Sequence, residues 1–166
     1  MKSHIAVVGA GSWGTTVASI VAQNQPTMLW ARRQALAKQI TTQHQNIDYL
    51  RDITLTESLS CSANLQEVVQ HASVVMMAVP SNGFREVLVE VAKNLSADVP
   101  IVSLAKGLER ETLMRMSEVI AQVLPRHNVA VLTGPNLAHE ILAGQPAATV
   151  VACADDEVAR QIQLLL

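Results

Sequence analysis

Residues 9–14 of the chain read Gly-Ala-Gly-Ser-Trp-Gly and form a G-x-G-x-x-G motif. A short apolar run at residues 5–8 directly precedes the motif. Trp13 within the motif, followed by Val17 and Ile20, has the spacing of a helix that buries one face. Glycine clusters alone occur in many turns, but a strand before the motif and a helix after it are the context that the motif requires. The chain is therefore predicted to begin with a strand that turns tightly into a helix.

The three glycines of this turn predict a site for the diphosphate of a dinucleotide. Gly9 permits the tight turn, Gly11 leaves room for a ligand beside the backbone, and Gly14 lets the helix pack closely on the strand. The backbone N–H groups of Ser12 and Trp13 would then face a phosphate at the positive end of the helix dipole. The alternative is a plain strand-to-helix turn that binds nothing.

Short apolar runs alternate with longer segments of helical period along the whole chain. Aromatic residues make up only 2 % of the sequence, so the core must consist of smaller apolar residues. Helices of this length join strands by crossover connections, which predicts an α/β fold with a doubly wound, mostly parallel sheet covered by helices on both faces. The predicted strands are residues 5–8, 28–30, 74–79, 101–104, 129–132 and 148–152; the predicted helices are residues 13–20, 34–43, 65–70, 84–91, 113–123, 137–142 and 155–165.

Composition excludes several classes of protein. Apolar residues make up 49 % and charged residues 16 %, which excludes a disordered chain, and a net charge of −2 provides no basic field for nucleic acid or anionic lipid. The longest apolar run, residues 74–79, is far shorter than the roughly 20 residues that span a bilayer. Cys61 and Cys153 and the five histidines lack disulfide or metal-ligand spacing. We expect a cytoplasmic protein without a metal site.

Two arginines come after the second predicted strand, where an NAD-binding domain usually carries a carboxylate for the ribose 2′-hydroxyl. Here the sequence has Arg32 and Arg33, and the nearest acid is Asp48. Two guanidinium groups can hold a 2′-phosphate, and we expect nothing at this position to repel it. The pattern predicts that NADP(H) binds at least as well as NAD(H). The alternative is a solvated arginine pair at the start of a helix.

Substrate-side residues are expected in loops after the later strands, since ligands of doubly wound sheets lie beyond the carboxyl ends of the strands. Lys106 comes just after the strand at residues 101–104 and would place a positive charge in the cleft, suited to a phosphate or an oxyanion. Gly134 and Asn136 come after the strand at residues 129–132 and offer backbone and amide hydrogen bonds. A surface lysine and a simple turn with an N-cap are the alternatives.

The end of the chain predicts a further helix. Asp155 and Asp156 are good helix-starting residues, and the chain then ends on three leucines without a Gly, Asn or Pro stop signal. We expect residues 1–166 to be the N-terminal piece of a longer protein, whose remaining part covers the leucines. A frayed terminal helix is the alternative.

Taken together, these segments resemble the N-terminal domain of bacterial NAD(P)-dependent glycerol-3-phosphate dehydrogenase. The resemblance covers nearly the whole chain, in the order of the family. It rests on residues 9–15 (Gly-Ala-Gly-Ser-Trp-Gly-Thr), 30–32 (Trp-Ala-Arg), 46–50 (Asn-Ile-Asp-Tyr-Leu), 78–81 (Ala-Val-Pro-Ser), 105–109 (Ala-Lys-Gly-Leu-Glu) and 134–140 (Gly-Pro-Asn-Leu-Ala-His-Glu).

The resemblance implies a Rossmann-like NAD(P)-binding domain and hydride transfer between the nicotinamide and glycerol 3-phosphate or dihydroxyacetone phosphate, in the service of phospholipid synthesis. It also implies a homodimer as a possible state of the full-length protein. Asn136 stands where the family usually has Ser or Thr, and Arg51-Asp52 replaces the usual Pro-Gly. Implied cofactor contacts are Ser12, Trp13, Arg32, Arg33, Tyr49, Lys106 and Ala138; implied substrate contacts are Lys106, Gly134 and Asn136.

The family's helical C-terminal domain, with the lysine that accepts the alcohol proton, is absent from these 166 residues. Hydride transfer needs such a positioned base. No catalytic residue is therefore predicted within the chain, and the isolated chain is expected to bind cofactor without turnover. Two other interpretations stay open: a module that senses NADP(H) without catalysis, and a different two-domain hydroxy-acid dehydrogenase.

Overall fold

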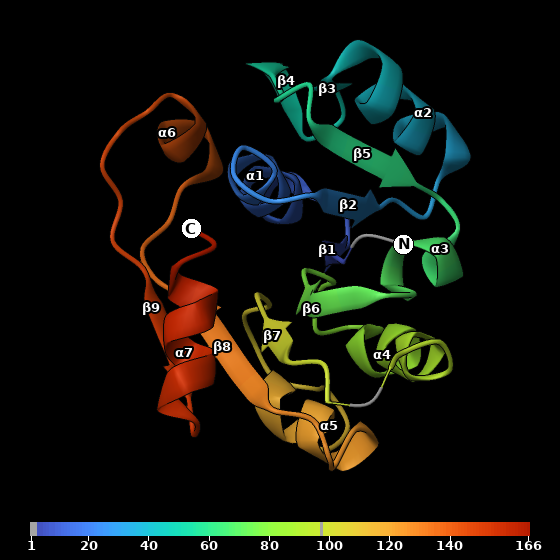
Figure 1. The fold of residues 1–166 in the computed structure, drawn as a ribbon, viewed down its shortest axis with the longest axis vertical. Helices are drawn as coiled ribbons and strands as arrows, with labels where there is room; N and C mark the ends of the chain where they lie inside the picture. Colours follow the sequence, from blue (N-terminus) through green and yellow to red (C-terminus); the bar gives the residue numbers. More distant parts are fainter. Residues whose placement is uncertain (1–2, 97) are drawn as a thin grey trace.

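The computed structural model describes residues 3–96 and 98–166, which form a layered α/β domain (Figure 1). A seven-stranded sheet has the strand order β5-β2-β1-β6-β7-β8-β9, and β3 and β4 pair separately. The strands are β1 (His4–Val8), β2 (Thr27–Trp30), β3 (Gln45–Asn46), β4 (Leu50–Thr54), β5 (Leu59–Ser62), β6 (Ala72–Met77), β7 (Ile101–Ser103), β8 (Val129–Thr133) and β9 (Val150–Cys153). The helices are α1 (Ser12–Val21), α2 (Gln34–Gln43), α3 (Leu65–Val69), α4 (Phe84–Ala92), α5 (Met116–Val123), α6 (Ala138–Leu142) and α7 (Asp156–Gln163).

Strand β1 is buried on both faces, as its continuous apolar run predicts. Because side chains alternate along a strand, Ile5 and Val7 join one core cluster with α1, α2 and α7, while Ala6 and Val8 join a second with α3, α4 and α5. Figure 1 shows α1 and α7 on one side of the sheet and α4 and α5 on the other. The predicted doubly wound architecture is confirmed.

The strand order reverses beside β1. From β1 the chain passes outward through β2 to β5, and it then returns to β6 on the other side of β1. The connections after β1 and β6 therefore diverge at the carboxyl ends of these strands. In open α/β sheets such a point is where ligands bind.

Strands β3, β4 and β5 are not among the predicted strands. Strand β5 has the sequence Leu-Ser-Cys-Ser, and it pairs in parallel with β2 at the edge of the sheet. An edge strand has one neighbour and can carry polar side chains, so its apolar signal is weak. Arg51 and Asp52 lie in β4, which pairs with β3.

The last strand departs from the parallel arrangement. Strand β9 runs antiparallel to β8, with Thr133 opposite Val150. The sequence predicts a strand here, but an apolar pattern does not specify the direction of an edge strand. The sheet is mostly parallel, as expected.

Several elements differ from their predicted ranges at their ends. Strand β6 covers Ala72–Met77 and so begins and ends two residues before the predicted range 74–79. Helix α5 begins at Met116 rather than at residue 113, because Leu113 has a left-handed backbone with φ 58° that no helix tolerates.

The predicted helix starts at Asn64 and Asp155 are both present. The Asp155 side chain accepts hydrogen bonds from the backbone N–H groups of Glu157 and Val158. The Asn64 side chain accepts from Glu67 N–H, but the Glu67 carboxylate accepts from Ser62 Oγ instead of closing a full capping box. Within the described residues, no helix is long and apolar enough to span a membrane.

Candidate functional site

The glycine turn is shaped by two positions where the protein itself leaves no room for a side chain. Gly9 has φ +119°, and a Cβ there would lie 2.7 Å from the carbonyl oxygen of Ala78. A Cβ on Gly14 would lie 2.0 Å from the carbonyl oxygen of Gly9. Both glycines are therefore explained by the fold alone, through the tight turn and the close packing of α1 on β1.

Gly11 differs from its two neighbours in the motif. Its backbone, with φ −71° and ψ 178°, is one that any residue adopts, and a Cβ on it would meet no described atom within 4 Å. Gly11 is also the N-cap of α1, with no capping side chain and no acidic residue in the first turn of that helix. The positive end of α1 thus faces open space, which is the arrangement that binds an anion.

Asn46 holds the glycine turn in place from a segment 36 residues away. Its side chain is fully buried, and its Nδ2 donates to the carbonyl oxygen of Ala10 at 3.0 Å and to Thr15 Oγ1 at 2.8 Å. Two structural elements, the turn and α1, are thereby tied to the segment between α2 and β4. Asn46 belongs to one of the segments that carry the family resemblance, but the sequence does not predict it as a site residue.

A cavity of about 290 Å³ lies at the carboxyl ends of β6, β7 and β8, beside the start of α1. Lys106 is the only charged residue among its described lining residues, and its Nζ donates to the carbonyl oxygen of Gly134 at 3.2 Å. Asn136 also lines the cavity, and its Oδ1 is buried without a partner within the described structure. The cavity is lined by Trp13, Ala78, Val79, Pro80, Leu104, Ala105, Lys106, Leu132, Thr133, Gly134 and Asn136.

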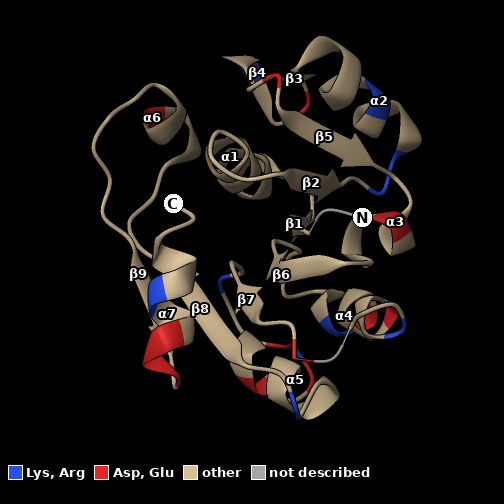
Figure 2. Cartoon of the chain, in the orientation of Figure 1, with Lys and Arg blue, Asp and Glu red and all other residues tan. Residues whose placement is uncertain are grey.

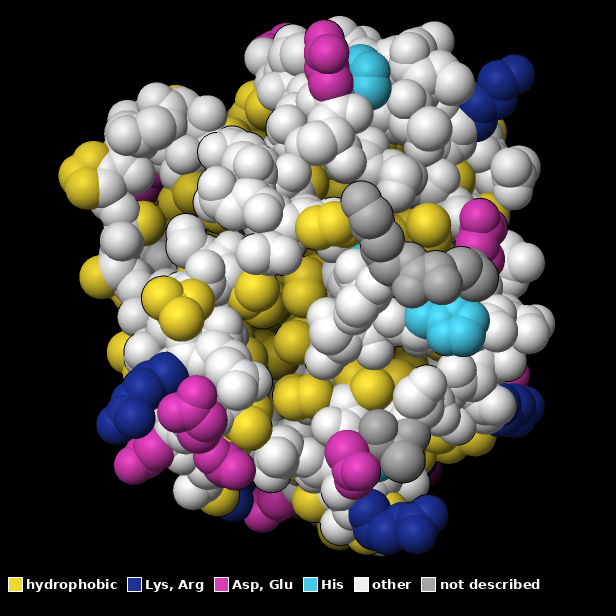
Figure 3. All heavy atoms as spheres, viewed as in Figure 1, with side chains coloured by type: hydrophobic (Ala, Val, Ile, Leu, Met, Phe, Trp, Pro, Cys, Tyr) yellow, Lys and Arg dark blue, Asp and Glu magenta, His cyan; other side chains and the backbone are white. Residues whose placement is uncertain are grey.

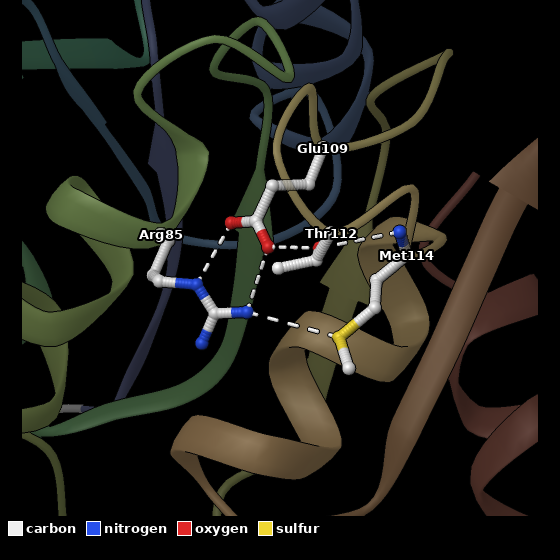
Figure 4. A network of polar contacts seen from close by, with 4 residues as sticks. All are labelled: Arg85, Glu109, Thr112 and Met114. Atoms are coloured by element: carbon white, nitrogen blue, oxygen red, sulfur yellow. Dashed lines mark hydrogen bonds and ion pairs between the residues drawn. The ribbon is translucent and has the colours of Figure 1, made fainter.

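The loop that carries Lys106 is braced from α4 by a bidentate ion pair (Figure 4). Arg85 Nε donates to Glu109 Oε1 at 2.7 Å, and Arg85 Nη2 donates to Glu109 Oε2 at 2.8 Å. Thr112 Oγ1 donates to the same carboxylate. Hydrogen bonds from Arg85 and then from Thr112 lower the pKa of Glu109 from its ordinary 4.5 to about 2. The carboxylate therefore stays ionised and keeps the loop between β7 and α5 tied to α4.

The two arginines lie at the other end of the candidate site, after β2, and one of them is engaged. Arg33 is the N-cap residue of α2, and its Nη2 donates to Asp48 Oδ2. The Asp48 carboxylate raises the pKa of Arg33, first through this hydrogen bond and then through its charge. The expectation that nothing here would repel a 2′-phosphate is therefore wrong, since Asp48 brings a negative charge to the site. Tyr49, the next residue, is half exposed.

The structure brings some of the predicted residues together and leaves others apart. Trp13, Lys106, Gly134 and Asn136 share the cavity, whereas Arg32, Arg33 and Tyr49 are not among its lining residues. Ala138 is absent from that cavity's lining. It begins α6, whose Ile141 and Leu142 line a second cavity of about 420 Å³ against α1.

Sequence reasoning also misses residues that support the site. Glu109 enters the sequence argument only as part of a family motif, and Arg85 does not enter it. The one usable signal is that Glu109 is an acid in a loop beside a predicted ligand-facing lysine. Its partner is 24 residues away in the chain, and spacing alone does not reveal such a contact.

Charges elsewhere on the molecule are mixed. Figure 2 shows both signs on α4 and on α7. Figure 3 shows charged side chains around the periphery of one face and hydrophobic side chains in the depression near its centre.

A parallel sheet that reverses its strand order at β1, with an uncapped glycine turn at that point, defines the class of dinucleotide-binding α/β domains. Comparison with known families then identifies the particular family. Residues 4–159 match the family described as "NAD-dependent glycerol-3-phosphate dehydrogenase N-terminus". The chain belongs to this family, and the resemblance found in the sequence is confirmed.

Individual relatives agree with the family match. The chain is 48 % identical over 165 residues to glycerol-3-phosphate dehydrogenase [NAD(P)+] 2 of Sphingopyxis alaskensis, covering 99 % of this chain and 50 % of the relative. It is 48 % identical over 162 residues to the Corynebacterium glutamicum (strain R) glycerol-3-phosphate dehydrogenase [NAD(P)+], covering 96 % and 49 %. A crystal structure of the Coxiella burnetii glycerol-3-phosphate dehydrogenase superposes with a TM-score of 0.92 at 29 % identity, covering 99 % of this chain and 51 % of that one. The chain thus spans about half the length of these relatives.

Proposed function

We propose that this domain binds NADP(H) and NAD(H) across the carboxyl ends of β1 and β6. The observation that carries the proposal is Gly11, a glycine that neither the backbone conformation nor packing within the protein requires. A missing side chain at the open N-terminus of a helix has a physical reason when a ligand approaches the backbone there. The diphosphate, with its negative charges, fits the backbone N–H groups of Ser12 and Trp13 at the start of α1.

The roles of the remaining residues depend on that placement. Arg32, Arg33 and Tyr49 would contact the adenosine end of the cofactor. Trp13, Lys106 and Ala138 would lie toward the nicotinamide end, and the substrate would contact Lys106, Gly134 and Asn136. The unpartnered Asn136 Oδ1 and the single charge of Lys106 support a polar, phosphorylated substrate in the cavity of about 290 Å³.

In the full-length protein we propose the reversible oxidation of glycerol 3-phosphate to dihydroxyacetone phosphate. The nicotinamide, when bound, supplies or takes up the hydride. Lys106 would hold the charged substrate, and the loop brace between Arg85 and Glu109 would keep Lys106 at the cavity. The proton of the alcohol needs a positioned base, for which the family resemblance implies a lysine of the C-terminal domain. We further propose a cytoplasmic enzyme of phospholipid synthesis, with homodimers of the full-length protein as its assembled state.

The test of this function has a binding part and a turnover part. Calorimetric titration with NADPH and with NADH is expected to give saturable binding of both. Replacing both Arg32 and Arg33 by Gln is expected to lower the ratio of NADPH to NADH affinity, and an unchanged ratio would contradict the role of the arginines. The isolated chain is expected to show no NADPH-dependent reduction of dihydroxyacetone phosphate, whereas the full-length protein is expected to reduce it. Robust turnover by the isolated chain would contradict the proposal that this domain binds the cofactor but does not catalyse the reaction alone.

A further inference from the structure

The ion pair between Arg33 and Asp48 is not explained by the fold. Both side chains are largely exposed, at 57 % and 47 %, and exposed ion pairs contribute little to stability. Arg33 belongs to the connection between β2 and α2, while Asp48 comes from the segment between β3 and β4. Two separate segments therefore place opposite charges together at the carboxyl end of β2.

The segment that carries Asp48 is anchored to the candidate site. Asn46, two residues before Asp48, is fully buried and donates to Ala10 in the glycine turn and to Thr15 on α1. The backbone N–H of Tyr49 donates to the carbonyl oxygen of Asn46 at 3.2 Å, which closes the segment into a tight turn. The Asp48 carboxylate is thus held at a fixed place relative to the glycine turn.

We propose that Asp48 narrows the preference of this site for NADP(H) over NAD(H), an inference that rests on the proposed function. Domains of this class that bind NAD usually have a carboxylate at the end of the second strand, which accepts a hydrogen bond from the ribose 2′-hydroxyl. This chain has Arg32 and Arg33 at that position, and Asp48 brings a carboxylate to Arg33 from another segment. Asp48 takes the place of the missing acid.

The two cofactors meet this arrangement differently. For NADP(H), Asp48 accepts a hydrogen bond from the Arg33 guanidinium that would otherwise be donated to the 2′-phosphate, and its charge repels that phosphate. Both effects lower the affinity for NADP(H). For NAD(H), the same carboxylate accepts a hydrogen bond from a ribose hydroxyl, and it neutralises Arg33. Arg32 has no ion-pair partner within residues 3–96 and 98–166 and stays available for the phosphate. Asp48 therefore narrows a preference for NADP(H) that the arginines alone would make large.

The test is the Asp48→Asn variant, titrated calorimetrically with NADPH and with NADH. This variant keeps the size of the side chain and removes its charge, and the ratio of NADPH to NADH affinity is expected to rise about threefold to tenfold. Glu90→Gln is the matched control, because Glu90 of α4 forms an exposed ion pair at 2.6 Å with Lys93, the C-cap residue of that helix. The control is expected to leave the ratio unchanged.

A second variant separates a specific effect from a general one. In an Arg33→Gln background, Asp48→Asn is expected to change the ratio by less than half as much, on a logarithmic scale, as in the wild type. Binding of both cofactors with the same ratio in wild type and Asp48→Asn would overturn this inference alone. Binding of neither cofactor by the wild type would overturn the proposed function, and this inference with it.

Discussion

The Asn46 side chain donates to the carbonyl oxygen of Ala10 at 3.0 Å and so ties β3 to the middle of the glycine turn. The same amide nitrogen reaches Thr15 on α1 at 2.8 Å. One buried side chain therefore sets the position of the turn relative to the helix that begins after it.

Replacing Asn46 by Ala should destabilise the protein and weaken cofactor binding together. The loss removes two buried hydrogen bonds and leaves the Ala10 carbonyl without its side-chain donor, at a cost of about 1–3 kcal/mol in the free energy of unfolding. Urea denaturation measures the stability, and titration with NADPH measures the binding. Asn94→Ala is the control, since the Asn94 amide makes one exposed hydrogen bond to the Glu90 carbonyl. Equal stability of Asn46→Ala and Asn94→Ala would contradict the role of Asn46.

The brace between Arg85 and Glu109 predicts a stability that depends on pH in a defined window. The folded protein holds the pKa of Glu109 at about 2, below its ordinary 4.5. A group whose pKa is lower in the folded state stabilises that state fully at pH values above its pKa in the unfolded chain. This contribution is lost as the pH falls through the pKa of the group in the folded state. Wild type should therefore be more stable than Glu109→Gln at pH 5 to 7, and the difference should shrink between about pH 4.5 and pH 2. Urea midpoints across this range measure it, and a difference that does not change with pH would contradict the account.

The Cys61 thiol is expected to be alkylated slowly in the folded protein. Burial raises the pKa of the Cys61 thiol to about 12, against a smaller opposing effect of a backbone hydrogen bond from Ala31. Because the thiolate is the reactive form, alkylation by iodoacetamide at pH 8 should be much slower in the folded state than in urea. Mass spectrometry of the Cys61 peptide over time measures both rates, and equal rates would show that the thiol is accessible and ionised.

The sequence predicts the central part of the sheet, but it misses the edge strand β5 and the direction of the edge strand β9. Ile5 and Val8 belong to a continuous apolar run because β1 is buried on both faces, and such a run is visible without a structure. Strand β5 carries Ser60 and Ser62 and has one neighbour, so its apolar signal is too weak to predict its pairing with β2. The reversed direction of β9 has the same origin.

For the candidate site, the sequence predicts the ligand-facing residues better than the residues that hold them. Gly11 and Lys106 come just after strands, and their position in the chain indicates their place in the fold. Asn46 and Glu109 act through partners 36 and 24 residues away, which only the folded chain brings together. The pairing of Arg33 with Asp48 is missed for the same reason.

Lys106→Gln should separate catalysis from stability. Lys106 is exposed, and its hydrogen bond to Gly134 is 3.2 Å long, so the free energy of unfolding should change by less than about 0.5 kcal/mol. In the full-length enzyme, loss of a charge that holds the phosphorylated substrate or an oxyanion should lower kcat/KM about 100-fold or more. Steady-state kinetics with dihydroxyacetone phosphate measure the effect, and Lys93→Gln at the C-cap of α4 is the control. A kcat/KM within threefold of the wild type would remove Lys106 from the site.

Gly11 offers a variant that changes the ligand site and not the fold. A Cβ there meets no described atom within 4 Å, whereas a Cβ on Gly14 would lie 2.0 Å from the Gly9 carbonyl oxygen. Gly11→Ala should therefore change the free energy of unfolding by less than about 1 kcal/mol, because the reduced freedom of the unfolded chain offsets the weaker preference of alanine for an N-cap. Gly14→Ala should be destabilised by about 1–3 kcal/mol through overpacking.

The most direct measurement is a calorimetric titration of wild type and Gly11→Ala with NADPH and NADH. If the diphosphate lies against the backbone at the start of α1, the wild type binds both nucleotides, and Gly11→Ala, with its melting temperature preserved, binds both at least about tenfold more weakly. Equal affinity of the two proteins would mean that the nucleotide does not approach Gly11, and no binding to the wild type would mean that this turn is a plain connection between a strand and a helix.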